Sequence, residues 1–217
     1  MRPDSTPSAR RTRKRLATRT SISDIATRLF FERGFDNVTV DAIAEAADVS
    51  RMTVFNHFPR KEDMFFDLDA EGREELIQAL RSKDPTLSPI DALRAFAHHA
   101  VAKRRPYVEF TDQSQLFIET IEASESLKAR ARTIRDELVR EVSAAVAESV
   151  GRAPGDPHAH LVAGIQVATW GVAMLEAHKT YQKTRKTAAA RKVLLAIVDK
   201  GAIGLATMMA GTPYAGD

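Results

Sequence analysis

A nine-residue stretch, SRMTVFNHF at residues 50–58, mixes hydrogen-bonding side chains with apolar ones and stops at Pro59. Val54, Phe55 and Phe58 can anchor a short helix, which leaves the remaining side chains to face outward. Arginine can bind guanine, and asparagine can bind adenine, through paired hydrogen bonds. Threonine or methionine can contact a thymine methyl group. The outward set therefore suits contact with base edges in DNA: Ser50, Arg51, Met52, Thr53, Asn56 and His57. The alternative is that these side chains only form a solvated helix face.

Two short helices are needed to position these side chains. Thr39 and Ser50 are hydroxyl residues that can cap the N-termini of the two helices. In each helix, a valine before the cap and an apolar residue four positions in can form a hydrophobic staple; the pairs are Val38 with Ile43 and Val49 with Val54. Asp48, between the helices, tolerates a left-handed backbone better than most residues. The pattern predicts a helix-turn-helix, whose second helix enters the major groove of DNA.

Positive charge is concentrated before these helices. Residues 1–20 contain seven basic residues and one acidic residue, so the other 197 residues carry a net charge of −3 within a total of +3. The centre of the block is RRTRKR at 10–15, from which we expect phosphate contacts by Arg11, Arg13 and Lys14. Thr39, Ser50 and Lys61 also lie where they could reach phosphates. A disordered, solubilising tail is the alternative explanation for the charge.

The composition excludes several classes of protein. The chain has no cysteine, so it has neither disulfides nor thiolate metal sites, and a reducing compartment is expected. No apolar segment follows the N-terminal charges as a signal peptide requires, and no apolar run reaches the roughly 18 residues of a membrane span. These features predict a soluble, cytoplasmic protein without a membrane partner.

Helix signals recur along the chain and strand signals are almost absent, which predicts an all-α fold of about nine helices. Besides the two short helices, the expected ranges are 10–33, 61–82, 89–104, 107–124, 125–150, 158–181 and 188–210. Gly34 is expected to cap the first of these at its C-terminus. We predict a disordered arm at 1–9, a DNA-binding domain at 10–60, and a ligand-binding and dimerisation domain at 61–217.

The last two predicted helices are apolar on more than one face, so each must be buried on more than one face. The economical arrangement is a homodimer in which these helices pack against their copies as a four-helix interface. Gly201 and Gly204 would permit close approach of the helices. A monomeric bundle that buries both helices completely is the alternative.

A ligand pocket is expected among the longer helices. The candidate lining residues are Phe96, His99, Phe117, Ile121, Trp170 and Met174, although ordinary core packing is an alternative for each of them. The basic stretch KRRPY at 103–107 could bind an anionic ligand, but stabilisation of a helix C-terminus is the preferred explanation.

No constellation for catalysis or cofactor binding is recognised. The sequence contains no glycine-rich phosphate loop, no G-x-S-x-G and no H-E-x-x-H motif. His98 and His99 are adjacent on a helix and would point apart. His158, His160 and Asp156 offer only a weak metal site. We therefore expect neither catalytic residues, nor metal ligands, nor a cofactor.

The helix-turn-helix segment also carries a family resemblance. VTVDAIAEAADVSRMTVFNHFPRKEDMF, preceded by LFFERGFDN, resembles the DNA-binding domain of TetR-type (TetR/AcrR) transcriptional regulators over roughly residues 18–66. Three positions depart from the family pattern. Asp48 replaces the usual turn glycine, Met52 replaces a small residue, and Phe55 replaces a frequent tyrosine whose hydroxyl commonly reaches a phosphate.

The resemblance implies an all-α homodimer that binds double-stranded DNA at a palindromic operator and responds to a small molecule. The expected function is repression, relieved by a small and largely apolar effector. Two rivals remain open. A DNA-architectural protein would bind without sequence preference, and a small enzyme would need a cluster of catalytic groups that the sequence does not display.

Overall fold

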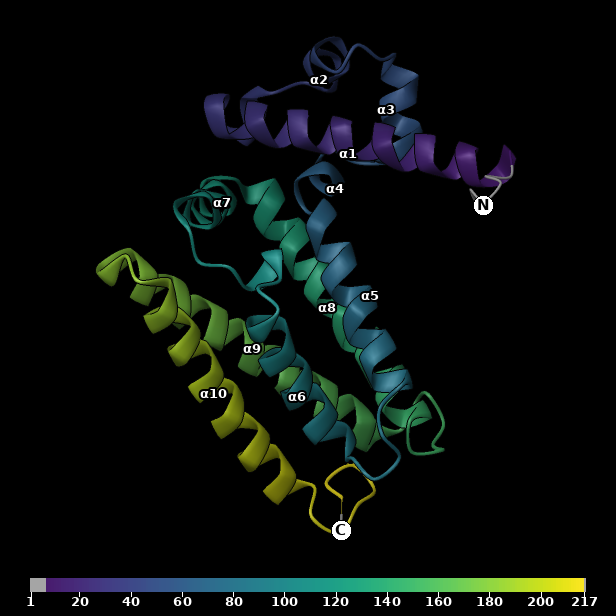
Figure 1. The fold of residues 1–217 in the computed structure, drawn as a ribbon, viewed down its shortest axis with the longest axis vertical. Helices are drawn as coiled ribbons and strands as arrows, with labels where there is room; N and C mark the ends of the chain where they lie inside the picture. The colour runs from purple at the N-terminus through teal and green to yellow at the C-terminus, as the bar shows by residue number, and fades with distance from the viewer. Residues whose placement is uncertain (1–6, 217) are drawn as a thin grey trace, which may run out of the picture. The chain divides into compact units, whose positions relative to one another are not determined.

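The computed structural model describes the backbone of residues 7–216 and the side chains of residues 10–67 and 72–216. This part of the chain contains ten α-helices, two short 3-10 helices and no strand (Figure 1). The bounds are α1 Pro7–Arg33, η1 Phe35–Asn37, α2 Val40–Ala46, α3 Arg51–His57, α4 Lys61–Phe65, α5 Asp67–Arg81, α6 Pro89–Ala102, η2 Pro106–Val108, α7 Asp112–Ala123, α8 Glu125–Glu148, α9 Pro157–Thr184 and α10 Thr187–Met208. The all-α prediction is confirmed.

The main differences between the helix bounds and the sequence-based prediction occur at three places, and the other predicted ends are off by at most three residues. Helix α1 begins at Pro7, so residues 7–9 of the predicted disordered arm are helical; residues 1–6 lie outside the described part. The helix expected at 61–82 is interrupted at Phe66, which ends α4 with a φ of −97° and a ψ of 22°. The helix expected from residue 107 starts only at Asp112, after the 3-10 turn η2.

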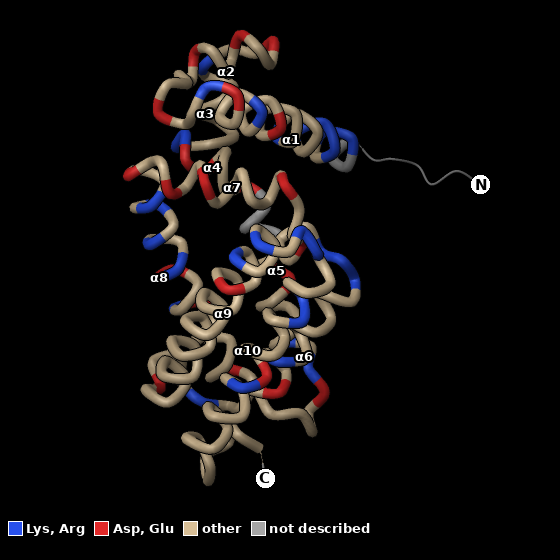
Figure 2. Tube along the Cα trace, turned by 90° about the vertical axis from the view of Figure 1, so that its left-hand side faces the viewer, with Lys and Arg blue, Asp and Glu red and all other residues tan. Residues whose placement is uncertain are grey.

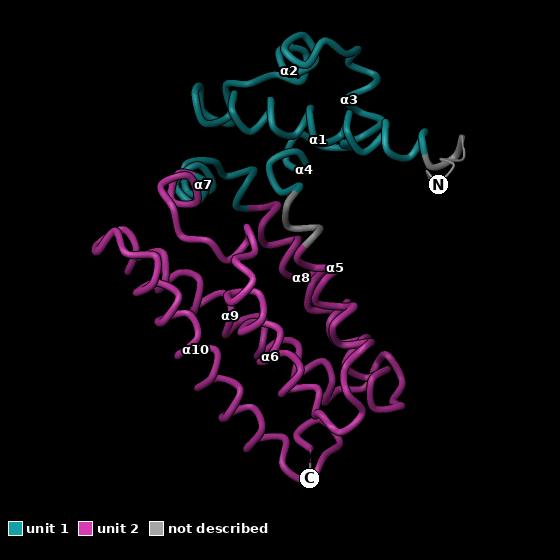
Figure 3. The backbone as a smooth tube through the Cα atoms, viewed as in Figure 1, with its two compact units in different colours: residues 1–67, 117–128 teal, residues 68–116, 129–217 magenta. Residues whose placement is uncertain are grey.

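The contacts divide the chain into two compact units (Figure 3). Unit 1 comprises residues 1–67 and 117–128, and unit 2 comprises residues 68–116 and 129–217. Unit 1 thus includes the C-terminal part of α7, which the sequence-based division placed with the ligand-binding domain. The three-part division at residues 9 and 60 stays a prediction.

The core of unit 1 is aromatic. Phe65 on α4 is 4% exposed, and its ring lies 4.5 Å from the ring of Phe117 in a nearly parallel stack. Phe30 and Phe35 pack on the same ring with centroids 6.0 and 6.1 Å away. Gly34, with a φ of 80°, ends α1 and donates its backbone N–H to Phe30 O, which confirms it as the C-terminal cap.

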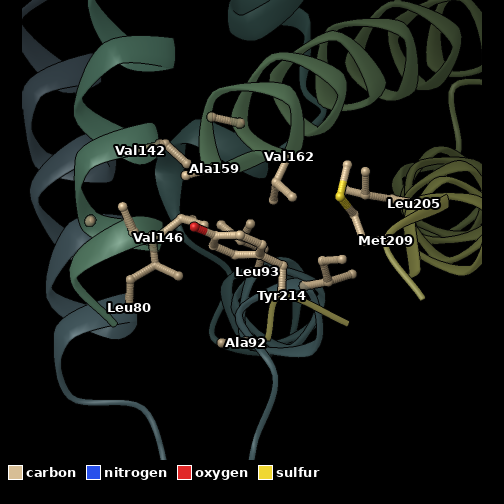
Figure 4. Packing of buried hydrophobic residues seen from close by; sticks show 14 of the residues in the cluster. Leu80, Ala92, Leu93, Val142, Val146, Ala159, Val162, Leu205, Met209 and Tyr214 are labelled. Atoms are coloured by element: carbon tan, nitrogen blue, oxygen red, sulfur yellow. The ribbon is translucent and has the colours of Figure 1, made fainter. Parts of the chain in front are cut away.

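Unit 2 is built around α9 and α10, which pack against each other. A Cβ atom on Gly201 of α10 would lie 2.4 Å from Thr169 Cγ2 on α9, so the two helices can meet here only because residue 201 is glycine. The C-terminal segment closes the other end of the core. There Tyr214 is 1% exposed and its ring lies among Leu93, Val146 and neighbouring apolar side chains (Figure 4).

Burial and the nearby Asp156 carboxylate raise the pKa of Tyr214 to about 12. Asp156 also caps α9 by accepting hydrogen bonds from the backbone N–H groups of His158 and Ala159. Tyr214 belongs to the same buried cluster as Ala159 and Val162, so the C-terminal segment packs on the first turns of α9. None of the described helices combines the length and the apolar character needed to cross a membrane.

Candidate nucleic-acid interface

Helices α2 and α3 have the local structure that the sequence predicts. Thr39 Oγ1 accepts a hydrogen bond from the backbone N–H of Ala42, and Ser50 Oγ accepts one from that of Thr53. The turn between the helices passes through Asp48, whose φ is 50°. Both helices are therefore capped at their N-termini and joined by one left-handed residue, as in a helix-turn-helix.

Helix α3 separates its buried side chains from its exposed ones. Val54 and Phe58 are fully buried and hold the helix to unit 1. Met52 is 68% exposed, and Arg51 and Asn56 are exposed as well. The Ser50 and Thr53 hydroxyls lie 2.8 Å apart, which keeps both near the start of the helix. The structure thus gathers the predicted base-reading side chains on one short helix.

Arg51 is held by two neighbours that the sequence did not indicate. Its guanidinium donates to the carboxylate of Asp41 on α2, with 2.9 Å between Arg51 Nη1 and Asp41 Oδ2. The same group lies 5.5 Å from the ring centroid of Phe55. Phe55, which replaces the tyrosine frequent in TetR-type domains, is thus placed beneath Arg51. An exposed ion pair contributes little stability, so its main effect is to direct the guanidinium.

The C-terminal end of α3 is fixed by Arg19 of α1. Arg19 Nη1 donates to the backbone carbonyl of His57 at 2.5 Å, while its Nε and Nη2 atoms donate to Asp67 Oδ1. The guanidinium also lies 4.1 Å from the ring centroid of Phe58. One side chain therefore joins the first helix, the end of α3 and the start of α5.

His57 occupies a positively charged setting. Partial burial and the charges of Arg15 and Arg19 lower the pKa of His57 below its ordinary value of 6.5. The lowered pKa favours the neutral imidazole, which can donate or accept a hydrogen bond.

Lys61 has an internal role. Its ammonium group donates to the backbone carbonyls of Phe35 and Val38 at 2.9 and 3.0 Å and lies 4.2 Å from the ring centroid of Phe35. Lys61 therefore ties the segment before α2 to the start of α4. A phosphate contact by this residue stays a prediction.

The N-terminal half of α1 is densely basic (Figure 2). Arg11, Arg13 and Lys14 are exposed on this helix, and Arg10 and Arg15 are exposed beside them. Leu16, in the same segment, is 57% exposed, so this part of the helix is not buried against the core of unit 1. The basic residues thus lie on a regular helix rather than on an irregular arm.

Unit 2 contains an apolar cavity of about 270 Å³. Its wall is formed by Gly72, Arg73, Leu76, Phe96, Ala97, Ala100, Tyr107, Val108, Ile134, Leu138, Trp170, Ala173, Met174, Leu194 and Val198. Three of the six predicted pocket residues, Phe96, Trp170 and Met174, are among them. His99 is exposed on α6 and does not line the cavity.

Phe117 and Ile121 belong to unit 1 and not to this cavity, because the C-terminal part of α7 packs with the aromatic core. In the described part of the chain, no group of three or more potential metal ligands comes together. His158 Nδ1 lies 3.8 Å from Asp156 Oδ1, but that carboxylate is engaged in capping α9.

Several functional contacts could not have been found from spacing alone. Asp41 lies ten residues from Arg51, and Asp67 lies 48 residues from Arg19. The alternation of charges gives no sign of either pair. Gln166 is a polar residue within an apolar helix, and the sequence shows this contrast. Its burial is seen only in the structure.

The capped helices α2 and α3 and the turn between them have the geometry of a helix-turn-helix. Comparison with known proteins agrees: residues 20–68 match the family described as bacterial regulatory proteins, tetR family. The HTH-type transcriptional regulator AcrR of Shigella flexneri is 33% identical over 87 residues, which cover 39% of this chain and 40% of AcrR. The chain thus matches about two fifths of the length of this relative.

Solved structures resemble the fold over most of the chain. NalD, the secondary repressor of the MexAB-OprM multidrug efflux pump in Pseudomonas aeruginosa, has a TM-score of 0.54 at 20% identity and covers 85% of this chain and 96% of its own. SmeT in complex with triclosan has a TM-score of 0.54 at 16% identity, covering 87% and 91%. The chain thus contains a segment at residues 20–68 that matches the tetR family, and its fold resembles these solved structures over most of its length.

Proposed function

We propose that the protein is a dimeric transcriptional repressor that binds a palindromic DNA operator and is released from it by a small, largely apolar effector. The exposed face of α3 carries this proposal. It places Arg51, Met52 and Asn56 on a capped helix, with Arg51 directed by Asp41. Arginine and asparagine on such a helix can select guanine and adenine in the major groove.

An exposed apolar stripe on α9 and α10 supports the dimer. On α10, Ile203 is 63% exposed and Met208 is 49% exposed, and on α9 Val172 is 54% exposed. Exposed apolar side chains gathered on the same two helices are typical of a protein interface. Gly204 lies in the stripe, and a Cβ atom placed on it would have no neighbour within 4 Å, so a second copy could approach closely there. A dimer supplies the two recognition helices that a palindrome requires.

The cavity of unit 2 supports effector binding. Part of its wall is formed by α5, through Gly72, Arg73 and Leu76. The first residue of α5, Asp67, forms an ion pair with Arg19, and Arg19 also donates a hydrogen bond to the backbone carbonyl of His57 at the end of α3. A ligand that favours a different position of α5 would therefore lower the affinity for DNA by shifting the population between two conformations. NalD is a repressor of a multidrug efflux pump and SmeT is solved with triclosan; we infer a comparable ligand response for this chain.

Fluorescence polarisation with labelled DNA from upstream of the protein's own gene tests the proposal. The double variant Arg51→Ala/Asn56→Ala removes two base contacts worth about 1–3 kcal/mol each, so we expect affinity for the operator to fall by roughly 10²–10⁴-fold. Both side chains are exposed, so the melting temperature should change little and serves as the control. Undiminished binding by the double variant contradicts the assignment.

The basic segment of α1 predicts a different pattern of loss. Arg11→Ala/Arg13→Ala/Lys14→Ala should weaken binding to all DNA sequences alike and reduce the dependence of affinity on salt. A protein of the DNA-architectural class would show this salt effect without any difference between operator and random DNA. A loss of affinity at a single base position would instead assign these residues to sequence reading.

A further inference from the structure

Among the described side chains that line the cavity of unit 2, no charged group lacks an ion-pair partner. Arg73 is its one charged residue, and its guanidinium forms ion pairs with Glu141 at 3.3 Å and Glu137 at 3.6 Å. The hydroxyl of Tyr107 donates to Glu75 Oε2 at 2.8 Å, and the other oxygen of Glu75 receives Arg105. A charged ligand would have to break these pairs, so a neutral ligand is favoured.

Two polar side chains of α9, those of Gln166 and Trp170, lack hydrogen-bond partners, and only one of them, Trp170, belongs to the cavity wall. Gln166 is 0% exposed, and neither its amide nitrogen nor its amide oxygen has a partner. Trp170 forms part of the cavity wall, and its Nε1 atom is also buried without a partner. The two residues lie four positions apart and therefore on the same face of the helix.

Each unpaired buried group is costly, which calls for an explanation within the molecule. An apolar residue at position 166 would avoid the cost, since the helix around it is apolar. Because both amide atoms of Gln166 are unpaired, exchanging their assignment does not change this result. The two residues together offer N–H donors from the indole and the amide, and one carbonyl acceptor.

We propose that the cavity takes a neutral, mainly apolar molecule that carries one carbonyl oxygen, and that this oxygen accepts hydrogen bonds from Trp170 Nε1 and Gln166 Nε2. The inference deepens the proposed function and rests on the effector binding in this cavity. The apolar part of the ligand fills the volume bounded by Phe96, Leu138 and Met174. Both donor atoms are buried in the ligand-free chain, so binding requires the indole of Trp170 and the amide of Gln166 to turn toward the ligand. The carbonyl oxygen then satisfies donors that are otherwise unpaired.

Benzophenone and diphenylmethane form a matched pair of probes, since they differ only in the carbonyl oxygen. Trp170 is the one tryptophan of the chain, so its fluorescence reports directly on occupation of the cavity. We expect the full chain to bind benzophenone about tenfold more tightly than diphenylmethane, the difference that one or two net hydrogen bonds supply. Benzoylbenzoate, the anionic analogue, should bind more weakly than benzophenone.

Two variants test whether Gln166 and Trp170 cause the preference for benzophenone over diphenylmethane. Their affinities are measured by calorimetry, because Trp170→Phe removes the fluorophore. Gln166→Met keeps the length of the side chain and Trp170→Phe keeps an aromatic ring, and each should reduce the preference for benzophenone toward unity. Gln166→Met also removes two unpaired buried atoms, so the ligand-free variant should melt at a higher temperature than the wild type. A loss of ligand preference in this variant could therefore not be attributed to unfolding.

Equal affinity of the wild-type chain for both neutral probes would overturn the inference. So would the absence of binding by either probe, tighter binding of the carboxylate, or an unchanged preference in both variants. The proposed function is tested separately by adding benzophenone to the DNA complex. If benzophenone binds as expected but leaves DNA affinity unchanged, the ligand class stands and the role of the cavity in repression fails.

Discussion

Unit 1 and unit 2 differ in whether their buried polar groups have hydrogen-bond partners. In unit 1, Ser23 is 8% exposed and donates to Met64 O, and the ammonium group of Lys61 donates to two backbone carbonyls. No buried side-chain atom without a partner is found in the described part of this unit. In unit 2, Gln166, Trp170 and His178 each have buried polar atoms without a partner.

The two cores also differ in how they fill space. Phe65 in unit 1 touches five other phenylalanine rings, with centroids between 4.5 and 6.2 Å away. Unit 2 leaves an apolar cavity of about 270 Å³. Close packing and complete pairing favour a single conformation, whereas a void and unpaired groups leave room for a bound molecule. Unit 1 therefore gives α3 a closely packed support, and the cavity that could hold a bound molecule lies in unit 2.

The largest effect is expected from Phe65→Ala, because it removes the ring on which the aromatic core of unit 1 is assembled. We expect a loss of about 3–5 kcal/mol in the stability of unit 1. Circular dichroism follows all helices, whereas Trp170 fluorescence follows unit 2 alone, so part of the helical signal should melt while the fluorescence stays native. Phe96→Ala in the cavity wall is the control and should cost less, since its ring already borders a void. Simultaneous loss of both signals in Phe65→Ala would contradict the separation.

A pair of enlargements tests the packing difference directly. Ala26 in unit 1 and Ala173 in unit 2 are both 0% exposed, but only Ala173 borders the cavity. Ala26→Leu should destabilise the protein by about 1–3 kcal/mol through overpacking. Ala173→Leu should change stability little, because its added atoms enter existing space, and should weaken binding of any ligand there. Urea unfolding measures both; equal costs would mean that the cavity cannot accept side-chain atoms.

The same difference explains what the sequence could predict. In the segment from Val38 to Phe58, structure depends on neighbours within a few positions: a hydroxyl caps its own helix, and the valine before each cap is expected to pack on an apolar residue four positions into the helix. The two caps were predicted residue by residue and are confirmed. The contacts of Arg19 with His57 and Asp67 were missed, since they join residues 38 and 48 positions apart.

The pocket could be predicted only in part for a related reason. The apolar pattern of a helix shows which face is buried but not what it faces, so Phe96, Trp170 and Met174 were found without the wall opposite them. Phe117 has the same apolar helix pattern as these three residues, but its ring stacks on Phe65 of unit 1 and does not line the cavity. No glycine or proline marks the break of the helix at Phe66, whose buried ring packs against those of Phe65 and Phe117.

Two glycines on α10 separate packing within the chain from the proposed dimer. Gly201→Ala introduces a Cβ atom 2.4 Å from Thr169 Cγ2 and should destabilise unit 2 by about 1–3 kcal/mol. Gly204→Leu meets no neighbour within the chain, so the monomer should remain folded while the dimer dissociates. Sedimentation at several concentrations, combined with thermal melting, distinguishes the two outcomes. A dimer that Gly204→Leu leaves intact would place the interface elsewhere.

The smallest effect concerns two histidines whose pKa values are lowered for different reasons. Burial lowers the pKa of His178, which is 5% exposed and packs edge-on against Phe110 with ring centroids 5.0 Å apart. The unfolded chain takes up a proton near the ordinary value of 6.5, before the folded chain does. Stability is therefore complete above that pH and should fall as pH decreases below it, by at most about 1.4 kcal/mol per pH unit for each histidine.

His178→Leu should remove this share of the acid destabilisation, which chemical unfolding at pH 7.5 and pH 5.5 can measure. For His57, the charges of Arg15 and Arg19 add to the effect of partial burial. Salt screens exposed charges, so 0.5 M KCl should reduce the contribution of His57 and leave that of His178 nearly unchanged. The two histidines thus extend the contrast between the units to electrostatics: we expect the charged surface proposed to contact DNA to respond to salt, and the buried core not to. An acid destabilisation in His178→Leu as large as that of the wild type would refute the burial of an unpaired imidazole as its source.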